Sequence, residues 1–132
     1  MAIKTESKLW LLIKKNTPSI CWNRLENSIN AGLPDLIGSI QGHNFFTTEL
    51  KITYDNKTIR FSPHQIAFHK VNHGIKFIMV ATADLSHLKL FDHSLAVVPR
   101  PLLVDYGPLT TIDNTKDKRQ WTKLIKIIEN KC

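Results

Sequence analysis

The fold of this chain is decided by two neighbouring stretches, Gly32-Leu33-Pro34-Asp35-Leu36-Ile37-Gly38 and Phe45-Phe46-Thr47-Thr48-Glu49-Leu50-Lys51-Ile52. Both are short and mainly apolar, and the polar turn Gln41-Gly42-His43-Asn44 separates them, so the sequence predicts an antiparallel hairpin. Because side chains alternate along a strand, Glu49 and Lys51 share one face of the second strand. An acid and a base therefore lie side by side on a strand that is otherwise mostly apolar.

Burying a carboxylate and an ammonium on such a strand costs free energy unless the groups are paired or bind a metal ion. The predicted hairpin brings Asp35, at the start of its first strand, alongside Glu49. Two carboxylates suit a hard cation such as magnesium, and Lys51 would orient a water or a phosphate oxygen. Taken alone, Asp35 after Pro34 is more simply explained as a turn-capping residue, and only Glu49 and Lys51 favour a site.

These residues resemble the active-site motif of the PD-(D/E)XK nuclease superfamily, with Pro34-Asp35 as its first part and Glu49-Leu50-Lys51 as its second. A longer ordered pattern is similar to the VRR-NUC branch, which includes small stand-alone phage and bacterial nucleases similar to Holliday-junction resolvases. The resemblance covers roughly residues 6–83. Its members are Trp22, Arg24, Glu26, Asn27, Gly32, Pro34, Asp35, Glu49, Lys51, Ser62, Pro63, Gln65 and Gly74.

The resemblance implies a single α/β nuclease domain over residues 1–132, with a restriction-endonuclease-like αβββαβ core. A mixed central sheet would be flanked by helices, and an extra helix would follow at the C-terminus. The implied catalytic residues are Asp35, Glu49, Lys51 and Gln65. The implied metal is Mg²⁺, with Mn²⁺ able to substitute, held by Asp35, Glu49, a backbone carbonyl near Leu50 and, through water, Glu6.

The implied activity is hydrolysis of phosphodiester bonds in branched DNA, above all four-way (Holliday) junctions, by a homodimer. Three alternatives of the same fold stay open, namely a linear-duplex, a nicking and a flap nuclease. From another functional class, a non-catalytic basic DNA-binding protein stays open as well. The residues expected to contact DNA are Arg24, Lys57, Arg60 and His69.

Several of these residues also have a simpler explanation. Glu6 suits the first turn of a helix, where an acid is favourable. Arg24 fits a surface pair with Glu26, and the basic loop of residues 53–61 fits a solvated surface. Gln65 completes a capping box with Ser62, which is a full structural role by itself.

Composition agrees with a polyanionic partner without identifying one. The 132 residues hold 18 Lys and Arg against 11 Asp and Glu, a formal net charge of +7. Two cysteines, Cys21 and Cys132, have no metal-ligand spacing and are expected to be reduced thiols. Six histidines include His69 and His73 on one helix face, but without a third ligand nearby zinc is disfavoured.

The longest early apolar run, residues 9–13, is far too short to cross a bilayer, and no small-residue cleavage site follows it. The sequence therefore predicts no membrane association and a cytoplasmic protein. If the chain is phage-encoded, as its compact format suggests by resemblance, that compartment is the host cytoplasm.

The remaining patterns predict the other elements. Helices are expected over residues 5–15, from Ser62 to a stop at Gly74, and over 116–130, with Ile66, Phe68 and Val71 facing inward. Strands are expected over 20–28 and, buried on both faces, over 75–82. Residues 88–91 and 95–98 are ambiguous short strands, and Pro99, Pro101 and Pro108 predict a loop.

Overall fold

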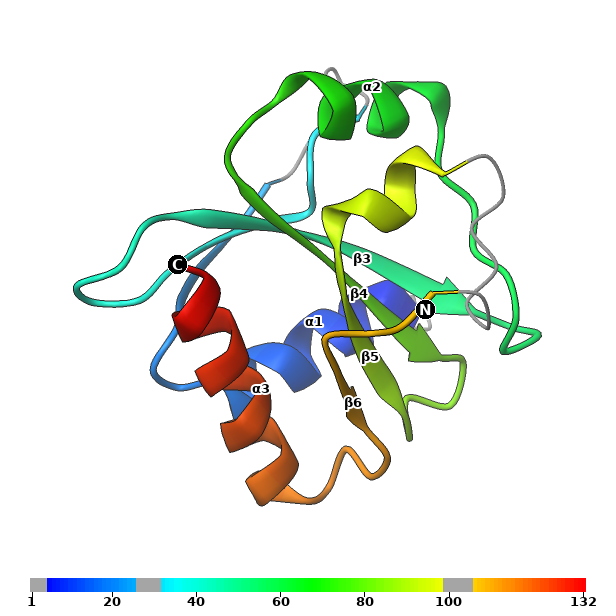
Figure 1. The fold of residues 1–132 in the computed structure, drawn as a ribbon. Coiled ribbons are helices and arrows are strands. Elements are labelled where there is room, and N and C mark those ends of the chain that lie inside the picture. Colours follow the sequence, from blue (N-terminus) through cyan, green and yellow to red (C-terminus); the bar gives the residue numbers. More distant parts are fainter. Residues whose placement is uncertain (1–4, 26–31, 99–105) are drawn as a thin grey trace.

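The computed structural model describes residues 5–25, 32–98 and 106–132. Within them the chain forms a mixed α/β arrangement of three helices, one short 3₁₀ helix and a six-stranded sheet (Figure 1). The elements follow one another as α1 (Thr5–Asn16), β1 (Cys21–Arg24), β2 (Leu36–Ser39), β3 (Phe46–Thr53), α2 (Pro63–Val71), β4 (Ile75–Thr82), β5 (Leu88–Asp92), η1 (His93–Val97), β6 (Thr110–Ile112) and α3 (Lys118–Lys131).

The sheet order follows the chain order, β1-β2-β3-β4-β5-β6, and only one pair of neighbours is parallel. β2 and β3 form the predicted antiparallel hairpin, with Leu36 opposite Thr48. β3 and β4 run parallel over their whole length, so α2 forms the crossover between them. The expected mixed sheet is therefore confirmed.

One face of the sheet is covered by α1 and α3 (Figure 1). Both helices bury an apolar stripe there, and an edge-to-face series of aromatic rings runs from Trp10 through Trp22 and Phe46 to Phe77. The buried members on the two helices are Leu9, Ile13, Trp121, Leu124 and Ile128. This face holds most of the apolar core.

The opposite face is covered by α2 and η1 and has a smaller apolar cluster around Ile78, Val80 and Phe91. Strand pairing places Glu49 beside Ile78 and Lys51 beside Val80, so both polar side chains belong to this face. The predicted alternation of β3 is thus present, with Leu50 buried in the core of the other face.

Several boundaries differ from the sequence-based predictions. The predicted strand 20–28 is β1 over its first half, while residues 26–28 lie outside the described residues. Helix α2 ends at Val71, with Asn72 as its C-cap, rather than at Gly74. Val71, the last residue of α2, is 70% exposed, so the prediction that it faces inward is wrong.

The region after β4 was the least predictable. Residues 88–91 form β5, but the second ambiguous run is the 3₁₀ helix η1, which begins where the Asp92 side chain accepts a hydrogen bond from the Ser94 N–H. Strand β6 was not expected and pairs antiparallel with β5. Pro99 and Pro101 lie outside the described residues. No helix in the described part of the chain has both the length and the apolar character to cross a membrane.

Candidate active site

Asp35 is positioned by a close approach between the segment before β2 and the start of α2. A Cβ on Gly32, whose φ is +94°, would lie 2.6 Å from the backbone carbonyl of His64, so only glycine fits there. The Asp35 backbone carbonyl accepts a hydrogen bond from the Leu25 N–H at 2.8 Å. Its side-chain Oδ2 accepts one from the Leu50 N–H at 2.7 Å. Asp35 is thereby fixed directly to β3.

Glu49 is a buried carboxylate with incomplete hydrogen bonding. It is 1% exposed, and its Oε2 atom has no hydrogen-bond partner. Burial, followed by the negative charge of Asp35, raises the pKa of Glu49 to about 8, against the opposing effect of Lys51. With a pKa near 8, Glu49 is mainly protonated at neutral pH while the site holds no cation, and a bound cation would favour its ionised form by giving Oε2 a partner.

Glu6, in the first turn of α1, brings a third carboxyl group to the site. The residue as a whole is exposed, but the desolvation of its carboxyl end and the neighbouring charge of Asp35 raise its pKa to about 7. Lys51 and Arg24 act in the opposite direction. The favourable position near a helix N-terminus is therefore not the whole account of Glu6, because the structure places it among the other acids.

Gln65 connects the acid and the base of β3. Its Oε1 atom accepts hydrogen bonds from the Lys51 Nζ at 2.9 Å and from the Ser62 N–H at 2.9 Å. Its Nε2 atom donates a hydrogen bond to Glu49 Oε1. The Ser62 hydroxyl completes the predicted capping box by accepting from the Gln65 N–H at 3.1 Å. One side chain therefore caps α2 and contacts both Glu49 and Lys51 at the same time.

Lys51 has a second contact that sequence patterns did not reveal. Its Nζ lies 4.9 Å from the centre of the Phe61 ring, which is within cation–π range. Phe61 precedes the helix cap Ser62, a position where an apolar residue often packs against the first turn of a helix. That local rule points to Phe61 as a packing residue but gives no sign of its contact with a lysine on another element.

An open pocket of about 730 Å³ lies over these groups. Its lining includes Thr5, Glu6, Asp35, Leu50, Lys51, Ile52, Tyr54, Asp55, Thr58, Ile59, Arg60 and Gln65. Glu49 does not line its surface, but its carboxyl group is close enough to Asp35, Lys51 and Glu6 for their charges to shift its pKa. The structure thus brings together all of the residues predicted to be catalytic or to hold a metal.

The predicted DNA-contacting residues are placed less uniformly. Arg60 is exposed and lines the pocket. Arg24 lies outside the pocket lining, where its Nη2 donates to the Ser7 hydroxyl at 3.1 Å, and Lys57 is exposed on the loop that follows β3.

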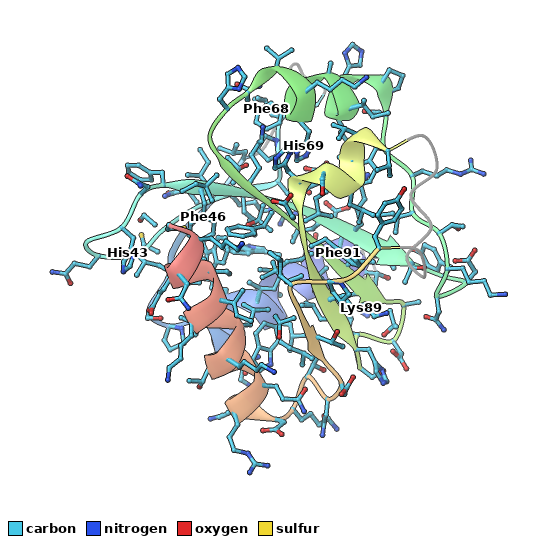
Figure 2. The ribbon with its side chains drawn as sticks, viewed as in Figure 1. His43, Phe46, Phe68, His69, Lys89 and Phe91 are labelled. Atoms are coloured by element: carbon cyan, nitrogen blue, oxygen red, sulfur yellow. The ribbon has the colours of Figure 1, made fainter. Side chains whose placement is uncertain are left out.

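His69 disagrees with its predicted role, because it is 3% exposed and does not face solvent. His69 belongs to α2 (Figure 2), and its ring stacks parallel to that of His93, the first residue of η1. Burial, with the nearby charge of Lys76, lowers the pKa of His69 to about 4. Its side chain is buried in this structure and offers no exposed surface for the predicted DNA contact.

The donor set fits a magnesium ion held by few protein ligands. Across residues 5–25, 32–98 and 106–132, no group of three or more His, Cys, Asp and Glu side chains is arranged to hold a metal ion. Magnesium is often bound by only one or two carboxylates, with water completing its shell. Asp35 and the unpartnered Oε2 of Glu49 meet that requirement.

Comparisons with known proteins add no relatives, since neither a protein-family profile nor a curated protein sequence matches the chain.

Proposed function

We propose that the chain is a magnesium-dependent DNA endonuclease of the PD-(D/E)XK type. The observation that carries this proposal is the buried, unpartnered Oε2 of Glu49 beside Asp35, with the Lys51 ammonium held on the same strand face. The order of α1 to β4, which runs helix, three strands, helix, strand, supports a restriction-endonuclease-like core.

In this proposal Asp35 and Glu49 hold the cation, together with the Leu50 backbone carbonyl, and Glu6 acts through water. When bound, Mg²⁺, or Mn²⁺ in its place, supplies Lewis-acid polarisation of the scissile phosphate and makes water more acidic. The hydrogen bond from the Leu50 N–H keeps the Asp35 carboxylate aligned with β3 before any cation arrives.

Lys51 stabilises the negative charge that develops on the phosphate during hydrolysis. Its ammonium is oriented in advance by Gln65 Oε1 and by the Phe61 ring, so little reorganisation is needed when the charge develops. Removing one such preorganised donor typically costs about 10²- to 10³-fold in rate. No nucleophilic side chain is required, because water is the nucleophile.

The proposed substrate is DNA, with branched molecules such as four-way junctions preferred. The net charge of +7 favours a polyanion, and Arg60 at the pocket supplies a phosphate contact. A two-fold dimer would present two such pockets to a junction of approximate two-fold symmetry. Binding that depends on phosphate contacts weakens as salt increases.

The test compares cleavage of a labelled four-way junction and its linear duplex arms, with Mg²⁺ or with EDTA. Wild type should cut only with Mg²⁺, Glu49→Gln should lose cleavage, and Lys51→Ala should fall about 10²- to 10³-fold. Asp113→Asn, an exposed carboxylate on the loop after β6, is the matched control and should cut like wild type.

The outcomes separate the alternatives. Symmetric cuts in the junction alone support a resolvase, and equal cutting of junction and arms supports a linear-duplex nuclease of the same fold. If no metal supports cutting while all variants bind DNA alike, the catalytic proposal is wrong and the chain is a DNA-binding protein.

A further inference from the structure

An exposed aromatic ring stands at the rim of the candidate active site. Tyr54 directly follows β3, the strand that carries Glu49 and Lys51, and it lines the same pocket as Asp35 and Arg60. It is 78% exposed. It lies three positions after Lys51 in the chain, which is about 10 Å at the rise of a strand.

Most aromatic rings of the described residues are used in packing. Rings from Trp10 to Phe77 form the edge-to-face series on one side of the sheet, and Phe61 and Phe68 pack against His69 on the other. Among the described aromatic residues only Phe45, at 72%, is similarly exposed, and it lies on the β2–β3 hairpin away from this pocket. Single exposed rings are normal on protein surfaces, and what distinguishes Tyr54 is its place at this pocket, where its ring is accessible to a ligand.

The loop that holds Tyr54 is ordered by hydrogen bonds to its neighbour. Asp55 Oδ1 accepts from the Lys57 N–H at 2.9 Å and from the Thr58 N–H at 2.8 Å. Asp55 Oδ2 accepts from the Thr58 hydroxyl at 2.7 Å. Because these contacts fix the backbone next to Tyr54, a ligand that stacks on the ring has little loop entropy to overcome.

We infer that Tyr54 is a stacking platform for an unpaired base of the DNA, next to the phosphate held near Lys51 and Arg60. This inference rests on the proposed function and, among its branched substrates, favours those with unpaired nucleotides, such as a flap, over a four-way junction whose bases are all paired. Bases within a duplex already stack on their neighbours and cannot offer a free face, so the platform selects DNA with unpaired nucleotides beside the cut. Stacking of a base on an aromatic side chain tolerates any sequence.

The binding test uses the Glu49→Gln background in EDTA, where no cutting occurs, with thermal melts to check folding. The probes are one labelled duplex and the same duplex with a short unpaired branch that carries 2-aminopurine. The variants are Tyr54→Ala, Tyr54→Phe and, as the matched exposed aromatic, Phe45→Ala. Tyr54→Ala should weaken branch binding about tenfold and abolish the quenching of 2-aminopurine, while duplex binding stays unchanged. Tyr54→Phe and Phe45→Ala should behave like the background.

Equal weakening for branch and duplex, or no change for either, overturns the inference. Cleavage assays with Mg²⁺ distinguish a failure of this inference from a failure of the proposed nuclease function. If the enzyme with native Glu49 cuts DNA but Tyr54→Ala leaves the ratio of branch to duplex cutting unchanged, the nuclease stands and the platform is wrong. If nothing is cut but quenching still depends on Tyr54, the platform stands and the nuclease is wrong. If no variant binds DNA, both are wrong.

Discussion

The two faces of the sheet are built on opposite principles. Beneath α1 and α3, four aromatic rings and the stripes of both helices form a continuous apolar core. Beneath α2 and η1, the apolar cluster is small, and polar atoms of Glu49, His69 and His93 are buried without hydrogen-bond partners. Apolar burial is therefore concentrated on the first face, and the second face buries ionisable side chains at a cost in stability.

The largest effect on stability is expected from a substitution in the apolar core beneath α1 and α3. Phe46→Ala removes the ring that contacts both Trp22 and Phe77, and it leaves a cavity in the middle of the core. We expect the free energy of unfolding to fall by about 3–5 kcal/mol, as measured by chemical denaturation. A loss below about 1 kcal/mol would show that the aromatic series does not carry the stability assigned to it.

Glu49→Gln should increase the stability of the protein at high pH, because it removes a buried group that would otherwise be ionised there. The folded pKa of Glu49, about 8, lies above its ordinary value of 4.5. The protonated folded state is therefore favoured, so its contribution to stability is complete below pH 4.5 and is lost as pH rises through 8. Above pH 8 the variant should be more stable than wild type, as measured by denaturation across this range.

The effect of magnesium on the melting temperature tests the role of Glu49 without a measurement of activity. The cation binds the deprotonated carboxylates, so it should raise the melting temperature of wild type more above pH 8 than near pH 6. Glu49→Gln should show little of this shift, and EDTA should remove it. An equal magnesium shift in both proteins would place the ion elsewhere.

The burial of His69 predicts how the stability of the protein changes at low pH. Its folded pKa, about 4, lies below the ordinary 6.5, so its neutral form contributes stability above pH 6.5 that is lost as pH falls through 4. His69→Leu should remove this dependence, which is at most about 1.4 kcal/mol per pH unit. Denaturation of both proteins between pH 7 and pH 4 measures it, and parallel curves would contradict the assignment.

The smallest effect is expected at the cap of α2. Ser62→Ala removes the hydroxyl that accepts from the Gln65 N–H, and it should cost about 1 kcal/mol of stability, while Ser62→Thr should keep most of it. Since Gln65 also holds Lys51, the alanine variant should lose cleavage rate beyond its loss of stability. If the fully folded alanine variant cleaves DNA at the wild-type rate, the Ser62 cap is not needed to position Gln65 for Lys51.

Local patterns in the sequence predicted the parts of the site that depend on one or two neighbouring elements. The hairpin, the shared face of Glu49 and Lys51, and the capping box that positions Gln65 follow from strand alternation and helix-cap chemistry. Hairpin register and helix caps are short-range properties, so a single sequence contains them. The mixed α/β class follows from a helix that runs into the strand 75–82, which its apolar run predicts to be buried on both faces.

The features that were missed depend on contacts between distant elements. β6 has three residues and is a strand only because the edge of β5 is free to pair with it. His69 is buried because α2 and η1 meet at that point, and α2 has no clean apolar stripe to show which side faces the sheet. The Phe61–Lys51 contact likewise joins two elements that no local rule connects.

The shared use of Gln65 also sets the order in which the site is completed. A chain made from its N-terminus presents α1 and β1 to β3 first, so the acids and Lys51 exist before α2 does. Gln65 reaches them only when the crossover docks and β4 pairs in parallel with β3, a long-range and therefore slow event. If the chain is the nuclease proposed above, that delay would keep an unfinished copy, which holds acids without an aligned lysine, from cutting the DNA around it.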